Sequence, residues 1–321
     1  MSHKIHVLHE NATWVEPLRA AFQTEGLPFA EWFLDEGTVD LEAPPPEGVF
    51  YNRMSASSYT RDHRYGPELT AIVLAWLERH GRRVVNDSRA VALEVSKAAQ
   101  YAALAASGIR TPRTIAAVGR QKLIEAADAF PAGPLILKPN RGGKGHGVQL
   151  FESGAALKRH VASEQYAPPV DGVALLQQYI RAPEPFITRA EFIGGRFFYA
   201  VRVDTSGGFE LCPADQCQVG DAFCPTAPAA PERPRFEIVD RIDPQLRRKY
   251  ESFLAANGIE IAGIEFIGDA EGRVFTYDVN TNTNYNAEAE ARDGRSGMRE
   301  IARFLGRELH GREAARARRV V

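Results

Sequence analysis

A segment rich in glycine and basic residues is the first feature suited to chemistry: residues 138–147 read KPNRGGKGHG. Glycines let a backbone approach an anion closely and take positive φ, and successive N–H groups can form an anion-binding nest. The segment fits neither G-x-x-x-x-G-K-S/T nor G-x-G-x-x-G, and its flanks predict that it joins two strands rather than a strand and a helix. We interpret it as a flap that covers phosphates. The alternative is a flexible hairpin tip whose basic side chains are merely solvated.

A second feature is a pair of carboxylates and an amide near the end of the chain. Glu265 interrupts the otherwise apolar run 261–267, and Asp278 and Asn280 lie in the run 274–280, the second arm of a predicted hairpin. These oxygens suit Mg²⁺, a hard cation that takes a few protein ligands and completes its shell with phosphates and water. The sequence therefore predicts a metal-binding face on this hairpin. The alternative is an ordinary polar face of an antiparallel sheet.

The hairpin geometry decides which of these side chains can meet. Because strand side chains alternate, Asp278 and Asn280 are predicted to share one face, while Tyr277 points to the other. With a four-residue turn between the arms, Glu265 faces Thr276 and lies diagonal to Asp278. Diagonal neighbours are roughly 7–8 Å apart along the backbones, a gap that long side chains can close around one ion.

Strands alternate with helices over about the first 85 residues, which is typical of a small parallel α/β lobe. A helical stretch follows, and beyond it the pattern changes to strands separated by glycines. The expected strands are 4–8, 31–34, 49–51, 83–85, 135–138, 147–151, 175–180 and the hairpins 191–203 and 261–280, and the expected helices are 14–25, 67–80, 88–107, 155–164, 245–257 and 296–309.

Composition and charge narrow the class of protein. The 321 residues are 44% hydrophobic and 25% charged with a net charge of −2, which excludes a disordered chain and gives no basic excess for nucleic acid or an anionic membrane. Apolar stretches are too short to span a membrane and three cysteines form no disulfide framework, so we expect a soluble cytoplasmic protein. Cys212, Cys217 and Cys224 cluster without the fourth ligand that a zinc site needs, and we expect them to be buried or loop thiols.

Together the glycine segment and the carboxylate hairpin resemble the ATP-grasp superfamily, most closely its RimK and glutathione-synthetase type of carboxylate–amine ligase. The resemblance extends from about residue 86 to residue 286. Members hold ATP between a glycine-flapped β lobe and a β lobe that bears magnesium ligands. The resemblance implies the ATP-grasp fold. This fold is of the α/β class, and its lobes are of the α+β type. We expect an N-terminal parallel α/β domain at 1–95, a central glycine-flap domain at 96–180 and a C-terminal antiparallel-sheet domain with the metal site at 181–321.

The resemblance also assigns residues to the nucleotide and the metal. Lys97 and Lys138 match two lysines that contact phosphates, and the run QQYI matches a hinge whose backbone binds adenine. The magnesium set, usually D…ExN, is matched with the Glu and the Asp exchanged. The implied nucleotide residues are Lys97, Lys138, Gly142, Gly143, Gly145, Gly147, Gln177, Gln178, Tyr179 and Ile180, and the implied metal ligands are Glu265, Asp278 and Asn280.

Further residues are expected on the acceptor side. Arg189 and Arg202 lie on the two arms of a Gly-Gly hairpin, and we interpret them as catalytic groups that stabilise the transferring phosphoryl group; the alternative is that either is an exposed strand arginine. Arg53 follows an N-terminal strand and could bind a substrate carboxylate bidentately, with Asn282 and Asn284 as further substrate residues. The run TNTNYN after the metal asparagine departs from the N-x-S-P-G of relatives, so the acceptor is not identified.

The implied activity is ATP-dependent amide-bond formation. ATP would activate a carboxylate as an acyl-phosphate and release ADP, and an amine would then displace phosphate. The expected substrates are amino acids, peptides or similar small carboxylates, and the expected cofactors are ATP and Mg²⁺, or Mn²⁺ in its place. We expect no nucleic-acid or membrane partner, and a homodimer or tetramer as in many relatives. Two alternatives stay open: an ATP-grasp kinase for a small molecule, and a non-enzymatic ATP-binding regulatory module.

Overall fold

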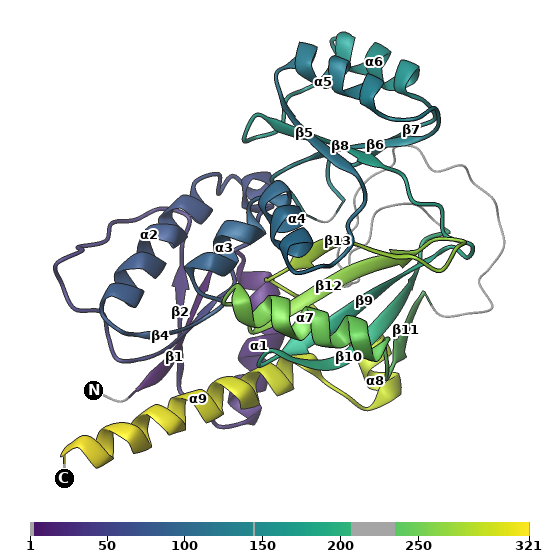
Figure 1. Cartoon of the computed structure of the whole chain (residues 1–321). Helices are drawn as coiled ribbons and strands as arrows, with labels where there is room; N and C mark the ends of the chain where they lie inside the picture. The colour runs from purple at the N-terminus through teal and green to yellow at the C-terminus, as the bar shows by residue number, and fades with distance from the viewer. Residues whose placement is uncertain (1–2, 144, 207–234, 321) are drawn as a thin grey trace.

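The computed structural model describes residues 3–143, 145–206 and 235–320, with side chains described up to residue 311. In these ranges three sheets follow one another along the chain, and Figure 1 shows the second sheet standing above the other two. The cluster of Cys212, Cys217 and Cys224 lies outside the described residues. Within the described part of the chain, no helix has both the length and the apolar character that crossing a membrane requires.

The first sheet is parallel throughout, as the alternation of strands and helices predicts, and its spatial order is β2-β1-β3-β4. Ile5 and Val7 pack with α1 on one face, whereas Leu8 and Phe50 pack with α2 on the other. The strands are apolar at consecutive positions because both faces of the sheet are covered. The elements of this lobe are β1 (Lys4–His9), α1 (Ala12–Thr24), β2 (Phe29–Phe33), β3 (Gly48–Asn52), η1 (Ser58–Arg61), α2 (Gly66–Arg79) and β4 (Arg83–Val85).

Two helices, α3 (Ser88–Glu94) and α4 (Lys97–Ala106), replace the single helical stretch that the sequence predicts here. The chain breaks at Ser96, whose side chain accepts a hydrogen bond from the backbone N–H three residues on and so begins a new helix. This N-cap puts Lys97 in the first turn of α4. Although α4 falls in the predicted central domain at 96–180, it packs against the core of the third sheet.

The second sheet is antiparallel and carries the flap. Its spatial order is β5-β8-β6-β7, and the glycine segment joins β6 to β7, two strands, as predicted. Leu123 and Leu157 pack α5 and α6 on one face of the sheet, and Figure 1 shows the other face turned toward the rest of the molecule. The elements of this lobe are β5 (Thr114–Val118), α5 (Arg120–Ala126), η2 (Ala127–Ala129), β6 (Leu135–Pro139), β7 (Gln149–Phe151), α6 (Gly154–Ala162) and β8 (Val173–Gln178).

The third sheet is antiparallel, with the order β11-β10-β9-β12-β13. Tyr250 and Phe253 of α7 cover one face together with α4. β9 and β10 meet at Gly194 and Gly195, whose φ values of 61° and 70° suit a tight hairpin turn that other residues would strain. The remaining elements are β9 (Phe186–Ile193), β10 (Arg196–Asp204), β11 (Phe236–Val239), α7 (Pro244–Ala256), β12 (Ile261–Gly268), β13 (Val274–Asn280), α8 (Ala287–Asp293) and α9 (Gly297–Val320).

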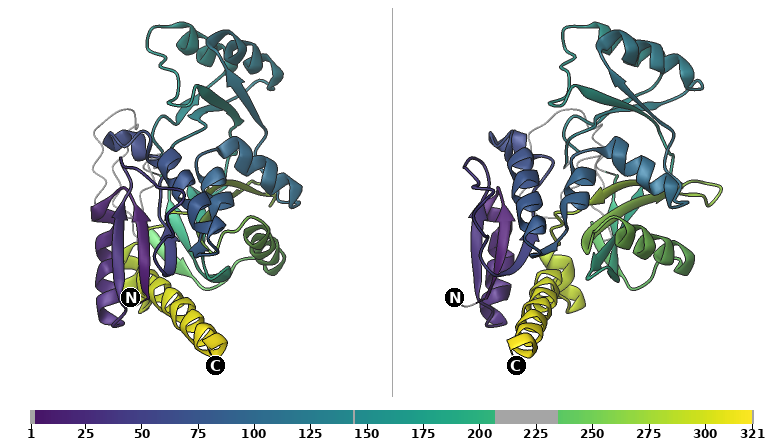
Figure 2. Two further views of the ribbon diagram at one scale, coloured as in Figure 1. Left: turned by 90° about the vertical axis from the view of Figure 1, so that its left-hand side faces the viewer. Right: turned by 60° about the vertical axis from the view of Figure 1, so that its left-hand side comes forward.

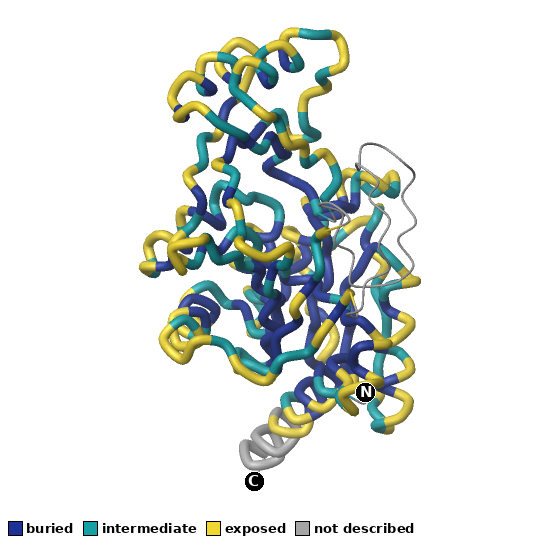
Figure 3. The backbone as a smooth tube through the Cα atoms, turned by 90° about the vertical axis from the view of Figure 1, so that its right-hand side faces the viewer, coloured by how far each residue is buried: buried dark blue, intermediate teal, exposed yellow. Residues whose placement is uncertain are grey.

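The first and third sheets share one core. Val7 of β1, Tyr199 of β10 and Leu305 of α9 belong to the same buried cluster, and Figure 2 shows the start of α9 between the two sheets. Figure 3 shows the buried positions concentrated where these sheets pack together and the exposed positions on the outer loops. The second sheet has a separate core of its own. Leu175 of β8, however, belongs to the core cluster of the third sheet, so the flap-bearing lobe also packs against the body below it.

Candidate active site

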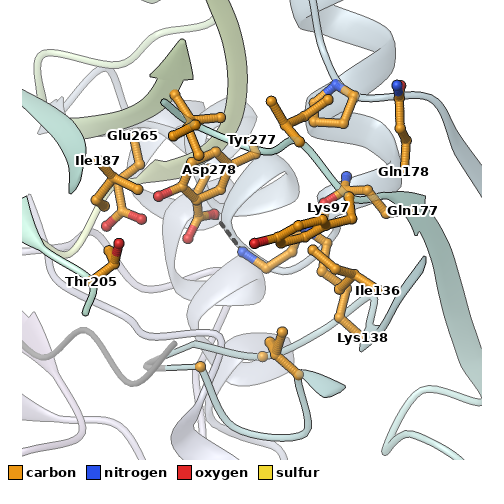
Figure 4. A pocket seen from close by; sticks show the side chains of 18 of the residues that line it. Lys97, Ile136, Lys138, Gln177, Gln178, Ile187, Thr205, Glu265, Tyr277 and Asp278 are labelled. Atoms are coloured by element: carbon orange, nitrogen blue, oxygen red, sulfur yellow. Dashed lines mark hydrogen bonds and ion pairs between the residues drawn. The ribbon is translucent and has the colours of Figure 1, made fainter. Parts of the chain in front are cut away.

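A pocket of about 420 Å³ lies between the second and third sheets. Strands β6 and β8 and the flap line one side of it, and β12, β13 and the first turn of α4 line the other. In the close view of Figure 4, Lys138 and Gln177 lie to the right and Glu265 and Asp278 to the left. Of the residues assigned above to nucleotide and metal, all but Gly147 line this pocket: Lys97, Lys138, Gly142, Gly143, Gly145, Gln177, Gln178, Tyr179, Ile180, Glu265, Asp278 and Asn280.

The flap has a backbone that needs glycine at several positions. A Cβ on Gly142 would stand 3.0 Å from the Cγ of Pro139, which is tighter than ordinary packing allows. Gly145 and Gly147 have φ values of 75° and 73°, a region that strains residues with a side chain. The backbone conformation of the loop thus requires these glycines, and this conformation places the loop backbone against the pocket.

Two lysines reach the pocket from different lobes. Lys97 Nζ is ion-paired with Asp278 Oδ1, and Lys138 Nζ donates a hydrogen bond to the hydroxyl of Tyr101, whose ring centroid lies 5.1 Å away. Burial opposes the charge of Lys97, but Asp278, Tyr101 and Glu94 together overcome this effect and raise the pKa of Lys97 above its usual value. Lys97 is therefore cationic at neutral pH, as a phosphate ligand must be.

The pairing of β12 with β13 differs from the predicted register. Glu265 pairs with Asp278 and Phe266 pairs with Thr276, so Tyr277 is an extra residue on β13. Such a β-bulge interrupts strict alternation, which is why Tyr277 lines the pocket beside Asp278 instead of pointing to the other face. The prediction that Glu265 faces Thr276 was wrong: the bulge brings Glu265 directly opposite Asp278.

The two opposed carboxylates differ in their electrostatic surroundings. Burial raises the pKa of Glu265 even though the Arg189 guanidinium lies nearby. Burial also opposes the charge of Asp278, but Lys97 outweighs burial and lowers the pKa of Asp278. Two carboxylates and the amide of Asn280 on one wall form a set of hard oxygen donors, so the residues present fit Mg²⁺.

Arg189 is buried and contacts Glu265, one of the two opposed carboxylates. Its guanidinium donates to Glu191 Oε1 at 2.6 Å, to Thr283 Oγ1 at 2.6 Å and to Glu265 Oε1 at 3.3 Å. Gly263 makes room for this side chain, because a Cβ there would stand 2.5 Å from Arg189 Nε. Arg189 therefore acts on the site through Glu265, one of the pocket-lining carboxylates.

Arg202 lies on the other face of the sheet from Arg189. On the paired strands β9 and β10, Arg189 faces Val201 while Arg202 faces Thr188, so the two arginines point to opposite faces of the sheet. Arg202 is exposed and lies over the ring of Phe186 at 4.9 Å, and neither Arg202 nor Arg189 is among the residues that line the pocket. The one-residue offset thus puts the two side chains on opposite faces of the sheet, and the catalytic roles of Arg189 and Arg202 stay predictions.

The three expected substrate residues meet, but they bind one another. Arg53 is 1% exposed, and it donates to Asn282 Oδ1 at 3.1 Å, to Asn284 Oδ1 at 2.8 Å and to the carbonyl of Thr283 at 3.2 Å. A guanidinium whose donors are taken up in this way is not presented to a ligand. The geometry favours a role for Arg53 in holding the loop that follows β13, and substrate contact by Asn282 or Asn284 stays a prediction.

The hinge residues lie where β8 leaves the second sheet for β9. Gln177 Nε2 donates to Thr114 Oγ1 at 2.8 Å, and the backbone N–H of Gln178 donates to the carbonyl of Arg113 at 2.8 Å. Tyr179 and Ile180 then continue along the rim of the pocket. The segment is thus anchored at its start and lines the end of the pocket away from the carboxylates.

Comparisons with known proteins identify this arrangement. No family model and no curated protein sequence matches the chain. Among solved structures, a RimK-domain ATP-grasp protein from Sphaerobacter thermophilus matches with a TM-score of 0.62 at 18% identity, over 94% of this chain and 98% of that one. The ATP-grasp ligase PsnB with a minimal precursor matches with a TM-score of 0.65 at 18% identity, over 95% of this chain and 99% of that one. The D-cycloserine synthetase DcsG matches with a TM-score of 0.61 at 20% identity, over 95% of this chain and 99% of that one. The chain has the ATP-grasp fold.

The ATP-grasp fold confirms the expected lobes: a parallel first sheet, a flap-bearing second sheet and an antiparallel third sheet. Several residues around the ATP-grasp pocket were missed by the sequence analysis. Tyr101 lies four residues after Lys97, so the helical repeat puts both on one face, and this spacing was the available signal. Glu191 lies two residues after Arg189 on the same strand face, a signal of the same kind. Gly263 carried no signal, because its role depends on an arginine from another strand.

Proposed function

We propose that this ATP-grasp chain is an ATP-dependent carboxylate–amine ligase. The observation that carries the proposal is that one pocket is lined by a glycine-rich flap, two lysines and a pair of opposed carboxylates. The flap and the lysines suit the phosphates of ATP, and the carboxylates suit Mg²⁺. Arg189, ion-paired with Glu265, adds fixed positive charge beside the carboxylates, which favours phosphoryl chemistry over nucleotide binding alone.

Each group of residues has a distinct task in this proposal. Lys97 and Lys138 bind phosphate oxygens, and the backbone at 177–180 binds adenine. Glu265, Asp278 and Asn280 would hold Mg²⁺, which when bound neutralises charge on the phosphates. Lys97 is paired with Asp278 in the structure, and in the proposed complex Lys97 would contact phosphate and Asp278 the metal.

The proposed reaction has two displacements. A carboxylate oxygen of the substrate attacks the γ-phosphorus, the bond from that phosphorus to its bridging oxygen breaks, and ADP leaves with the electron pair. The amine then attacks the acyl carbon, phosphate leaves, and the amine nitrogen loses a proton. The chain orients both substrates. Lys97 and Lys138 place positive charge near the phosphoryl group, and Arg189 contributes through its contact with Glu265.

The substrate class is supported by the structural neighbours. Structures of PsnB have been solved with precursors, and two of them also contain Mg and ADP. DcsG is named for the synthesis of D-cycloserine. We therefore propose an amino acid, a peptide or a similar small molecule as the carboxylate substrate of this chain. A homodimer or tetramer and a cytoplasmic location remain part of the proposal.

The decisive experiment is a screen for coupled products. Purified protein is incubated with ATP, Mg²⁺ and amino acids and short peptides in pairs, and ADP, phosphate and new amides are measured together. With the correct carboxylate, hydroxylamine in place of the amine should trap the acyl-phosphate as a hydroxamate. Release of AMP and pyrophosphate would contradict the proposal. ADP with a phosphorylated product and no amide would indicate the kinase, and ATP binding without turnover in any pair would indicate the binding module.

A further inference from the structure

The outer edge of β13, the strand that carries Asp278 and Asn280, is bound by side chains of helix α4. Gln100 Oε1 accepts from the backbone N–H of Val279 at 2.8 Å, and Gln100 Nε2 donates to the Val279 carbonyl at 2.7 Å. Gln100 is 1% exposed. One buried amide side chain therefore satisfies both backbone groups of Val279, as a neighbouring strand would.

Tyr101, the next residue of α4, binds both walls of the pocket. Its hydroxyl donates to the carbonyl of Tyr277 on β13 at 2.7 Å and accepts from Lys138 Nζ on β6. A phenolic hydroxyl has one hydrogen, so donation to Tyr277 leaves its lone pairs for the lysine. A single oxygen thus holds the metal-bearing strand and the phosphate-binding lysine at a fixed separation.

The start of α4 is tied in turn to the base of the flap. Asn140 lies two residues after Lys138, where the flap begins. Its Oδ1 accepts from the backbone N–H of Ala98 at 2.9 Å and from Ser96 Oγ at 3.2 Å, and its carbonyl accepts from the N–H of Lys97 at 3.1 Å. Helix α4 is therefore bound to the flap at its first turn and to the metal-bearing strand along its side.

We propose that Gln100 and Tyr101 are positioning residues through which α4 couples nucleotide binding at Lys138 and the flap to metal binding on β13. This inference rests on the proposed function, since it assumes that nucleotide and Mg²⁺ occupy the pocket. Neither residue lines the pocket, so neither touches the ligands. Both act by fixing the backbone on either side of Asp278.

The physical argument concerns preorganisation. A metal ligand that is already held in place loses little freedom when the cation binds, whereas a ligand on a loose strand edge has to be ordered first. Removing the Tyr101 hydroxyl leaves the Tyr277 carbonyl and Lys138 without their shared partner. Mg²⁺ and nucleotide should then bind more independently of each other.

The test compares Tyr101→Phe with Tyr250→Phe. Tyr250 is a matched control because its buried hydroxyl also binds β13, at 2.7 Å from Thr276 Oγ1. It does so from helix α7, and neither Tyr250 nor Thr276 lines the pocket. Calorimetry measures the affinity for a non-hydrolysable ATP analogue with and without Mg²⁺ in the wild type and both variants. A structural role alone would lower the melting temperature of both variants without changing the ratio of the two affinities.

We expect the Mg²⁺ enhancement of analogue binding to fall roughly two- to tenfold in Tyr101→Phe, the effect of losing about one hydrogen bond, and to stay at the wild-type value in Tyr250→Phe. Gln100→Leu should also speed amide hydrogen exchange in β13 of the ligand-free protein. If Gln100→Leu does not fold, Tyr101→Phe decides the question alone.

An unchanged Mg²⁺ enhancement in Tyr101→Phe would overturn the coupling while leaving the proposed ligase intact. Failure of the wild-type protein to bind the analogue at all would overturn the proposed function, and with it the coupling. The two failures are therefore distinguished by the wild-type measurement.

Discussion

Lys97 and Asp278 form an ion pair that joins the first turn of α4 to β13, the strand bearing the proposed metal ligands Asp278 and Asn280. Their side chains are 12% and 19% exposed, so the pair lies at the pocket wall rather than on open surface. Each side chain of the pair neutralises the charge of the other, which would otherwise be unbalanced at the pocket wall. In the proposed complex the cation of the pair turns to phosphate and the anion to Mg²⁺, so the pair keeps both groups ready for their ligands.

Asp278→Ala should abolish most Mg²⁺-dependent ATP turnover. The change removes a metal ligand, and the loss of one well-placed charged group at a phosphoryl-transfer site costs roughly 100-fold or more. Steady-state release of ADP at saturating Mg²⁺ measures the effect. Glu271→Ala, in the turn of the same hairpin and 65% exposed, is the control and should keep wild-type turnover. Near wild-type activity of Asp278→Ala would remove Asp278 from the metal site.

Gly143→Val should weaken ATP binding far more than it lowers the melting temperature. A Cβ at Gly143 would meet Ser57 at 3.6 Å, an ordinary contact, so the free protein tolerates it, whereas a branched side chain obstructs the approach of phosphates to the backbone. Nucleotide titration calorimetry and thermal unfolding provide the two measurements. Gly268→Val, at a glycine with open space around it, should leave affinity unchanged. Equal ATP affinity in Gly143→Val and the wild type would make the segment a plain hairpin tip.

Gly263→Ala should destabilise the protein by roughly 1–3 kcal/mol, because overpacking forces side chains from their positions. The added methyl group would stand 2.5 Å from Arg189 Nε, and this guanidinium cannot move without giving up Glu191, Thr283 or Glu265. Denaturant unfolding gives the free energy, and Gly268→Ala on the same strand is the comparison. If the two variants were equally stable, the close approach of Gly263 to the Arg189 guanidinium would be refuted.

Metal affinity should fall as the pH is lowered, and Glu265 should be responsible for much of the change. Burial raises the pKa of Glu265, so its proton competes with the cation at pH values above the usual glutamate range. The pKa of Asp278 is lowered, mainly by Lys97 acting against burial, so Asp278 stays ionised in that interval. Calorimetry in two buffers of different ionisation enthalpy measures the protons released on Mg²⁺ binding. Glu265→Gln should release fewer protons, and identical release in the variant would show that another group titrates.

Regular patterns in the sequence predicted much of the architecture. The alternation of strands and helices in the first lobe predicted a parallel sheet, and the glycines between two apolar runs predicted a flap joining β6 to β7. The Gly194–Gly195 pair predicted the turn between β9 and β10. These features succeed because each depends on residues close together in the chain.

The errors have the opposite character, since each depends on contacts between distant segments. The bulge at Tyr277 cannot be recognised from alternation, because one inserted residue leaves an equally plausible strand on each side. The offset that separates Arg202 from Arg189 follows from the pairing of β9 with β10. The burial of Arg53 depends on Asn282 and Asn284, which lie more than 200 residues later in the chain.

The shared core of the first and third sheets has a consequence for synthesis on the ribosome. Ile5 and Val7 are covered in the folded protein by a cluster that includes Ile301 and Leu305 of α9. Translation at about 5–20 residues per second separates these segments by roughly 15–60 s. Throughout that interval the nascent first lobe keeps an apolar face in water, so we expect chaperone capture of ribosome-bound chains that end before Gly297. Pulldown of stalled chains of increasing length would show capture lost once α9 has emerged, or no length dependence if the first lobe closes its core alone.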